Sequence, residues 1–400
     1  MIAGMILPLP NSSPYSNFRT CSVLTLIASG FMGTGCERET PPQTVVQTEA
    51  AKAVSPEKKS DALTAGLRLN QMQVIGTHNS YHIAPDILTY SLFDARAEAL
   101  DYTHQPMTAQ LDAGIRGFEL DVFVDDAGGR YAHPISIVGR WHDARFDAPG
   151  FKVLHIPDMD QESICPTLAG CLQDMAAWSA LHPEHVPVFV MLECVAVDVP
   201  SFPGFDITDP ERWELRHVEE LERLVQATFG ADQLITPDRV RGNAASLREA
   251  ITTVGWPTID ELRGKFMFVI TVDDHVVAKH LARHPGLRET ALFADCGDQS
   301  PDGVFCVMND PTADGKRIGE VAARGVVIRT RADENVVEPL SGSTERQKRA
   351  LASGACIVST DFPAADPNME SGYMTCMPGG GTARIHPLAN DPRAGQSIRP

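Results

Sequence analysis

Apolar runs of strand length alternate with helix-length segments along the chain from residue 70 onward. Short runs rich in Val, Ile, Leu and Phe are typical of strands that are buried on both faces. Eight strands are predicted, over residues 72–79, 117–124, 152–156, 187–193, 265–274, 304–310, 325–333 and 356–361. The helices predicted between them include residues 167–182, 211–229 and 343–354.

This alternation predicts a parallel sheet whose faces are covered by helices. Eight strand–helix units in one uninterrupted segment, residues 67–400, indicate a single α/β domain of the TIM type, a closed (β/α)8 barrel. An open, doubly wound sheet is the alternative. It is less favoured, because no glycine-rich turn follows the first predicted strand.

Polar residues gather at the carboxyl ends of the predicted strands, which is where barrel enzymes build their active sites. Glu119 and Asp121 are two residues apart on one strand, so their side chains point to the same side and Leu120 points to the other. The other strand ends carry His78, Asn79, His155, Glu193, Asp273, Asp274, Asn309, Arg329, Arg331 and Asp361. We therefore expect the functional site at the mouth of the barrel.

Four of these side chains offer oxygen ligands to a divalent cation: Asn79, Glu119, Asp121 and Glu193. Three carboxylates at one barrel end repel one another, and no Lys or Arg lies beside them in their strands. One amide and three carboxylates suit Ca²⁺ better than Zn²⁺, and Mg²⁺ fits the same ligand types. The alternative without a metal is a network in which the carboxylates bind backbone groups or distant arginines.

Two histidines, His78 and His155, are predicted to face the same opening. A hard cation with two imidazoles beside it is suited to phosphodiester cleavage. The metal lowers the pKa of an attacking hydroxyl, cationic groups stabilise the phosphoryl oxygens, and an imidazole protonates the leaving alkoxide.

The run IGTHNSYH resembles the opening motif of the phosphatidylinositol-specific phospholipase C superfamily, the PLC-like phosphodiesterases. GIRGFELDVF resembles the second-strand motif of that superfamily, VLH the third and VFVMLE the fourth. The stretch from residue 70 to residue 362 is most similar to the bacterial, calcium-dependent phosphoinositide branch. Calcium-independent bacterial relatives have Asp where this chain has Asn79 and use an arginine in place of the metal, so the motifs indicate the metal-dependent side.

The resemblance implies that His78 and His155 are the catalytic histidines, and we favour His78 as the general acid and His155 as the group that stabilises charge. It implies Ca²⁺ ligands at Asn79, Glu119, Asp121 and Glu193. One of the carboxylates, with Glu119 and Glu193 as the candidates, would double as the general base.

The resemblance also implies the substrate, a glycerophospholipid such as phosphatidylinositol whose 2-hydroxyl attacks the phosphorus. Asp273 and Asp274 stand where eukaryotic relatives have phosphate-binding lysines, which argues against a polyphosphorylated headgroup. Arg329 and Arg331 could bind the substrate, or they could pair with Asp273 and Asp361. The alternatives to a phospholipase C are a glycerophosphodiester phosphodiesterase and a binding barrel of the cell envelope without activity.

Composition and charge limit the partners. Hydrophobic residues make up 43% of the chain and charged residues 22%, as in ordinary globular proteins. The formal net charge of −18 would repel phosphates, so we expect no nucleic-acid partner. We expect a monomer whose partners are a phospholipid or other phosphodiester substrate and a membrane surface.

The first 36 residues predict export. Arg19 precedes a short apolar run, residues 21–32, and the small residues after this run lead to Cys36, as in a lipobox whose cysteine carries lipid. A cleaved signal peptide without lipid is the alternative. Residues 37–66 are polar and contain Pro, which predicts a disordered tether. We expect the protein in the bacterial cell envelope, as a lipoprotein or periplasmic protein, or secreted.

An oxidising compartment permits disulfides, and seven cysteines remain once Cys21 and Cys36 are set aside. Pairing them in sequence order predicts Cys165–Cys171, Cys296–Cys306 and Cys356–Cys376, with Cys194 free. Seven unpaired, buried thiols are the alternative.

Overall fold

The computed structural model describes residues 63–91, 97–136, 139–195 and 207–398. The predicted export signal, the lipidation site Cys36 and nearly all of the predicted tether lie outside the described residues. None of the described helices combines the length and the apolar composition needed to cross a membrane.

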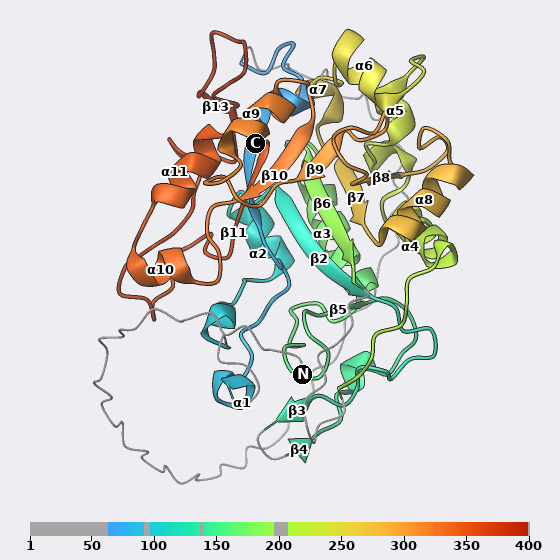
Figure 1. Ribbon diagram of the computed structural model, residues 1–400, viewed down its shortest axis with the longest axis vertical. Helices are drawn as coiled ribbons and strands as arrows, with labels where there is room; N and C mark the ends of the chain where they lie inside the picture. The colour runs from blue at the N-terminus through green and yellow to red at the C-terminus, as the bar shows by residue number, and fades with distance from the viewer. Residues whose placement is uncertain (1–62, 92–96, 137–138, 196–206, 399–400) are drawn as a thin grey trace, which may run out of the picture. The chain divides into compact units, whose positions relative to one another are not determined.

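Eight parallel strands form a nearly closed barrel, which confirms the predicted fold class (Figure 1). In spatial order they run β8, β7, β6, β2, β1, β11, β10 and β9. Their bounds are β1 (Met72–Thr77), β2 (Gly117–Phe123), β6 (Val188–Cys194), β7 (Phe266–Thr271), β8 (Leu292–Ala294), β9 (Phe305–Val307), β10 (Val327–Arg331) and β11 (Ile357–Thr360).

The barrel is left open between β8 and β9, the two strands at the ends of this order, because no ladder joins them in the described chain. A side chain bridges the opening: the backbone N–H of Val307 on β9 donates to Asp295 Oδ2, just after β8, at 3.1 Å.

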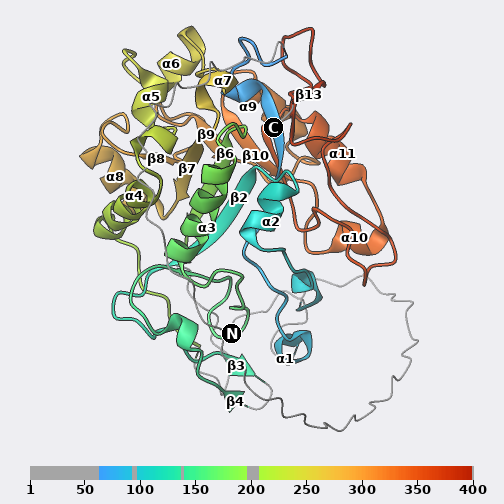
Figure 2. The ribbon, with the colours of Figure 1, turned by 180° about the vertical axis from the view of Figure 1, so that it is seen from behind.

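Helices surround the strands, and the opposite views in Figures 1 and 2 show them outside the barrel. One of the two long helices is α3 (Leu168–Leu181), whose first turn is capped by the Thr167 hydroxyl accepting from the Gly170 N–H. The other helices are α1 (Ile87–Ser91), α2 (Met107–Asp112), α4 (Leu215–Phe229), α5 (Pro237–Arg241), α6 (Leu247–Thr253), α7 (Ile259–Leu262), α8 (Asp274–Arg283), α9 (Gly315–Ala322), α10 (Val337–Ser341) and α11 (Glu345–Ala352).

Strand alternation divides the core into an inner and an outer layer. On β2, Phe118, Leu120 and Val122 are buried in one hydrophobic cluster with apolar residues of α3 and α4. The intervening Glu119 and Asp121 therefore point into the barrel. Gly117 at the start of the strand leaves room for the Ile357 side chain, since a Cβ at Gly117 would lie 2.6 Å from Ile357 Cγ2.

Two strand predictions are corrected by the structure. Of residues 152–156 only Lys152–Val153 form a strand, β5, and β5 pairs antiparallel with the end of β2, so it is not a barrel strand. The missing barrel strand is β8, which has only three residues and no alternation long enough to recognise. Short antiparallel pairs complete the secondary structure: β3 (Ile135–Ser136) with β4 (Gly139–Arg140), and β12 (Ala383–Ile385) with β1 and with β13 (Ser397–Ile398).

The structure contains one of the three predicted disulfides, Cys165–Cys171, with Cα atoms 5.3 Å apart. The four cysteines of the other two pairs are free, as is Cys194. Cys356 directly precedes β11, whereas Cys376 lies beyond its other end, where the Thr375 N–H donates to Phe362 O at 2.8 Å. β11 alone spans about 13 Å at ~3.3 Å per residue, far more than a disulfide bridges.

The other predicted pair lies at the open side of the barrel. Cys306 is within β9, where it pairs in register with Ile328, whereas Cys296 follows β8, the strand that does not pair with β9. Although Cys296 and Cys306 are close in sequence, they form no disulfide with each other in the structure.

Candidate active site

Glu119, Asp121 and Glu193 gather at the carboxyl ends of β2 and β6. The register sets Asp121 beside Glu193 on neighbouring strands, with Glu119 one inward position earlier on β2. One carboxylate oxygen from each side chain lies within 4.8 Å of the others. Asp121 Oδ1 is buried and has no hydrogen-bond partner among the described residues. Such an unsatisfied carboxylate oxygen between two further carboxylates is what a hard cation requires.

Asn79 is joined to this cluster through its neighbour. It adopts a left-handed backbone conformation, φ +43°, directly after β1, and its side-chain amide donates to the Tyr102 hydroxyl at 3.3 Å. The next residue, Ser80, exchanges two bonds of 2.9 Å with Glu119, one through each backbone N–H. Donation by the Asn79 amide nitrogen leaves its carbonyl oxygen as the available ligand atom.

Arg329 supplies one contact of the kind that the alternative without a metal describes, in which a carboxylate pairs with an arginine from a distant strand. It reaches from β10 to pair with Glu119, and it also donates to Asn309 Oδ1 at 2.6 Å and Ser359 Oγ at 3.2 Å. The sequence left open whether Arg329 and Arg331 bind the substrate or pair with Asp273 and Asp361. Arg331 does form one of the pairs anticipated from the sequence, with Asp361 at 2.6 Å.

The three carboxylates differ in their affinity for protons. Burial raises the pKa of Asp121 well above its usual value, and the charge of Glu193 adds to the shift. Burial and Glu119 likewise raise the pKa of Glu193 to about 7, although its side chain reaches the opening. Burial acts the same way on Glu119, but Arg329 outweighs it and the pKa falls. Without a cation, then, one charged carboxylate sits among two that tend to hold protons.

His78 forms a triad with two residues from other strands. Its Nδ1 lies 2.7 Å from Asp361 Oδ1, and its Nε2 lies 3.3 Å from Arg331 Nη1. Burial and the Arg331 charge lower the pKa of His78, outweighing Asp361. The geometry fits a neutral ring that donates from Nδ1 to the carboxylate and accepts at Nε2 from the guanidinium.

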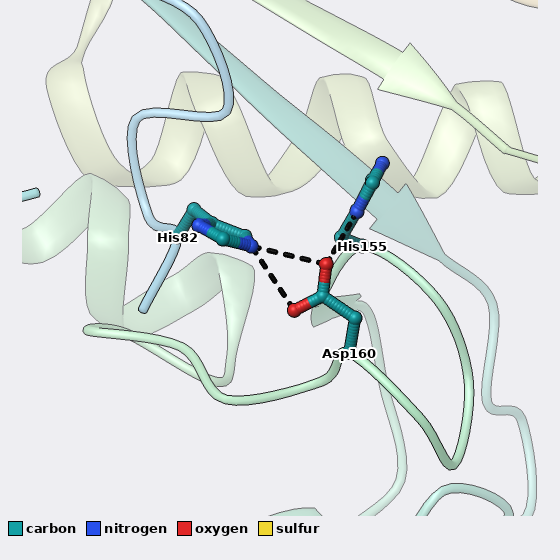
Figure 3. A group of neighbouring side chains, drawn as sticks. All are labelled: His82, His155 and Asp160. Carbon is teal, nitrogen blue, oxygen red and sulfur yellow. Dashed lines mark hydrogen bonds and ion pairs between the residues drawn. The ribbon is translucent and has the colours of Figure 1, made fainter. Parts of the chain in front are cut away.

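His155 also binds an aspartate, Asp160, but its pKa shifts the other way (Figure 3). Its Nδ1 lies 2.7 Å from Asp160 Oδ2. Burial lowers the pKa of His155, but Asp160 outweighs burial, and Asp121 and Glu193 add to its effect, so the pKa rises to about 9. A pKa raised this far favours the cationic form of His155 at neutral pH.

Both histidines can be reached by a substrate. Their side chains are 20% and 26% exposed, whereas their partners Asp361 and Asp160 are 2% and 0% exposed. Neither Asp160 nor His82, which also contacts it, was among the site residues expected from the sequence. Their signals were the second histidine of IGTHNSYH and an aspartate five residues after His155.

Two cavities of the described chain are lined by none of the three clustered carboxylates. The larger, of about 730 Å³, is lined by Asp125, Arg130, Arg140 and Thr208 among others, and by none of the predicted site residues. A smaller one of about 170 Å³ is lined by Tyr102, His104 and Phe362 and reaches Asp361. The clustered carboxylates therefore lie at the carboxyl ends of the strands and line neither of these two cavities.

The raised pKa of Glu193 predicts how pH changes stability. Between its ordinary value near 4.5 and about 7, the folded chain binds more protons than the unfolded chain, so stability without metal should fall as pH rises. We expect Tm in chelator to fall from pH 5 to pH 7, and the Tm gain on adding Ca²⁺ to grow over the same interval. Thermal unfolding at each pH measures both. Glu193→Gln should flatten the dependence, and an equally steep dependence in that variant would contradict the assignment.

A family model described as phosphoinositide phospholipase C, Ca²⁺-dependent, matches residues 67–387. No curated protein matches the chain.

The chain is also similar to solved structures. One is a calcium-dependent phosphoinositol-specific phospholipase C from the Gram-negative bacterium Pseudomonas sp., with 16% identity, a TM-score of 0.49, and coverage of 75% of this chain and 92% of that chain. A Ca²⁺-dependent phosphatidylinositol-specific phospholipase C from Streptomyces antibioticus has 19% identity, a TM-score of 0.48, and coverage of 74% and 95%. A phosphatidylinositol-specific phospholipase C from Listeria monocytogenes has 14% identity, a TM-score of 0.42, and coverage of 75% and 93%.

Proposed function

We propose, from the premise that this chain belongs to the Ca²⁺-dependent phosphoinositide phospholipase C family, that it cleaves the headgroup phosphodiester of a glycerophospholipid, phosphatidylinositol. The observation that carries the proposal is a pair of aspartate-bound histidines with opposite pKa shifts beside a carboxylate cluster. Two titratable groups whose surroundings push their pKa values apart are suited to the roles of base and acid.

The residues that would hold Ca²⁺ are Asn79, Glu119, Asp121 and Glu193. The buried, unpartnered Asp121 Oδ1 supports this assignment. Once bound, the cation would supply the positive charge that lowers the pKa of an attacking hydroxyl. Arg329 holds Glu119 in its charged form, so at least one ligand is ready without loss of a proton.

His78 is assigned as the general base and His155 as the general acid, whereas the sequence favoured His78 as the general acid and His155 as the group that stabilises charge. The neutral His78 accepts the proton of the inositol 2-hydroxyl as its oxygen bonds to phosphorus. The cationic His155 gives a proton to the glycerol oxygen as the bond from phosphorus to that oxygen breaks. The products are an inositol cyclic phosphate and a diacylglycerol. We assign the base to His78 in place of Glu119 or Glu193, because those carboxylates serve as ligands.

Arg331 is the arginine that we assign to the phosphoryl oxygens. Its Nη1 lies beside His78 Nε2, the atom that receives the proton, so its charge faces the reacting phosphate. Arg329 already contacts Glu119, Asn309 and Ser359. We therefore assign it the role of holding the cation ligand Glu119 in place.

A membrane surface is the proposed location of the substrate. Exposed large apolar side chains follow the carboxyl ends of four barrel strands: Leu88 after β1, Trp141 after β2, Val337 and Leu340 after β10, and Met374 after β11. Leu88 lies in α1, Val337 and Leu340 lie in α10, and Trp141 directly follows β4; these elements lie at the end of the barrel where the strands have their carboxyl ends (Figure 1). Such side chains can enter a lipid surface around the site. We propose a monomer that acts in the bacterial cell envelope or outside the cell after export.

Phosphorus NMR of the products tests the proposal. The purified protein is incubated with vesicles of phosphatidylinositol, phosphatidylcholine or phosphatidylglycerol, and with the deacylated forms of the same lipids, each with and without a calcium chelator. We expect an inositol cyclic phosphate from the first lipid in the presence of Ca²⁺. A glycerol phosphate from deacylated lipids would indicate a glycerophosphodiester phosphodiesterase instead, and no product from any substrate would indicate a binding barrel without activity.

A further inference from the structure

His82 is a fully buried histidine that contacts two other loops at the mouth of the barrel, one through Tyr102 and one through Asp160. Its Nδ1 lies 3.0 Å from the backbone oxygen of Tyr102, and its Nε2 lies 3.0 Å from each carboxylate oxygen of Asp160. Its ring stacks on that of Tyr102, with centroids 4.3 Å apart. Backbone bonds to Asn79 and His104 fix the chain on either side of this contact.

Both ring nitrogens of His82 face groups that can only accept. The backbone oxygen of Tyr102 lies at Nδ1, and the Asp160 carboxylate lies at Nε2. The two contacts fix the ring of His82 between these groups, so that it presents a fixed partner to Asp160.

Asp160 lies between two imidazole rings, as Figure 3 shows. One oxygen accepts from both His82 and His155, and the other accepts from His82. Burial alone would raise the pKa of Asp160, but His82 and His155 outweigh it and lower the pKa to about 2. The two rings stand almost perpendicular, at 83°, so His82 can reach the carboxylate without blocking His155.

The backbone around His155 does not by itself fix the ring. The strand before it, β5, has two residues, and the turn that follows includes Asp158 at a positive φ of 66°. Asp160 is the side chain that orients His155, and it belongs to the same turn. The bond from His82 connects this turn to the segment that follows β1, a separate part of the barrel mouth.

We propose that His82 is a positioning residue for the proton donor His155 and acts through Asp160. The inference rests on the proposed function, in which His155 protonates the leaving alkoxide. A carboxylate held by His82 keeps the Nδ1–H of His155 bonded, so that the opposite nitrogen, Nε2, faces the substrate. The same logic applies wherever a buried acid fixes a catalytic imidazole.

His82→Gln tests the link, because glutamine keeps a polar group of similar reach but cannot hold both Tyr102 and Asp160 as the imidazole ring does. We expect kcat on phosphatidylinositol to fall about 10- to 100-fold with KM changed less than about twofold, as for other residues that hold a catalytic group through one hydrogen bond. A nitrophenyl inositol phosphodiester should show almost no loss, because its leaving group needs no proton. The double variant His82→Gln/His155→Ala should be no slower than His155→Ala.

His185→Gln is the matched control. His185 is also buried with both ring nitrogens bonded, to Ser179 Oγ at 2.9 Å and to the Val186 backbone oxygen at 2.7 Å, but it precedes β6 at the opposite end of the strand from the site. It should alter Tm and leave the ratio of the two substrates unchanged. If His82→Gln does not fold, Asp160→Asn tests the same link and should show the same selective loss.

Other results would overturn the inference. Equal losses on both substrates, or a further loss in the His155→Ala background, would indicate a general structural role for His82. Tightly bound zinc in the purified protein that is lost in His82→Gln would show that His82, His155 and Asp160 form a metal site. If His155→Ala itself keeps full activity, the proposed function fails; if only His82→Gln does, the positioning role alone fails.

Discussion

Alanine at His78 or at His155 should lower kcat on phosphatidylinositol by about 10²- to 10⁴-fold, the usual contribution of a positioned base or acid. Each histidine is the reachable member of a pair whose aspartate is buried, so truncation removes the group that moves the proton and leaves its support in place. Steady-state rates on lipid vesicles measure the loss. His185→Ala serves as the control, because it removes a buried imidazole far from the carboxyl ends of the strands.

An acidic leaving group distinguishes the two histidines. With a nitrophenyl inositol phosphodiester, His155→Ala should recover most of its rate, because the leaving oxygen needs no proton, whereas His78→Ala should stay impaired. Recovery by His78→Ala instead would restore the roles favoured from the sequence. Near-normal activity of both variants on the natural lipid would show that the phospholipase C mechanism is wrong for this protein.

Removal of Ca²⁺ by a chelator should abolish turnover, because the remaining site has one charged carboxylate and two that tend to hold protons. Asp121→Asn should raise the Ca²⁺ concentration needed for half-maximal rate, since it replaces a carboxylate whose Oδ1 has no partner among the described residues. Activity and Tm across a Ca²⁺ titration measure this change in the Ca²⁺ requirement, because an ion that binds only the folded chain raises Tm.

Asp126→Asn is the control for this charge change. Asp126 follows β2 but is exposed and pairs with Arg216, outside the carboxylate cluster. Its Ca²⁺ requirement should equal that of the unaltered protein. Full turnover in excess chelator would contradict the calcium assignment, and equal shifts in the two variants would show that net charge, and not the cluster, governs binding.

The sequence predicts the carboxylate cluster well because its geometry is local. Glu119 and Asp121 share a face through the two-residue period of a strand, and a parallel register with β6 brings Glu193 beside them. The polar ends of continuous apolar runs are visible without a structure. The same reasoning places His78 and Asn79 at the end of β1.

What the sequence does not show are contacts that depend on the closure of the barrel. Arg329 on β10 meets Glu119 on β2, and Arg331 on β10 meets His78 after β1, because the sheet curves into a barrel that brings these separated strands together. The position of His155 follows from a loop, and Asp160 and His82 come together through a turn with no recognisable period. A strand as short as β8 has too few residues for a pattern, so one barrel strand was missed and β5 was counted in its place.

The open side of the barrel, finally, leaves two strand edges that could recruit strands from another molecule. Edges of this kind promote aggregation when they are long and their backbone groups are free. Here each edge strand has only three residues, and the Asp295 carboxylate already occupies the Val307 N–H. By accepting from this N–H, Asp295 removes one of the backbone donors with which a strand from a second molecule would pair.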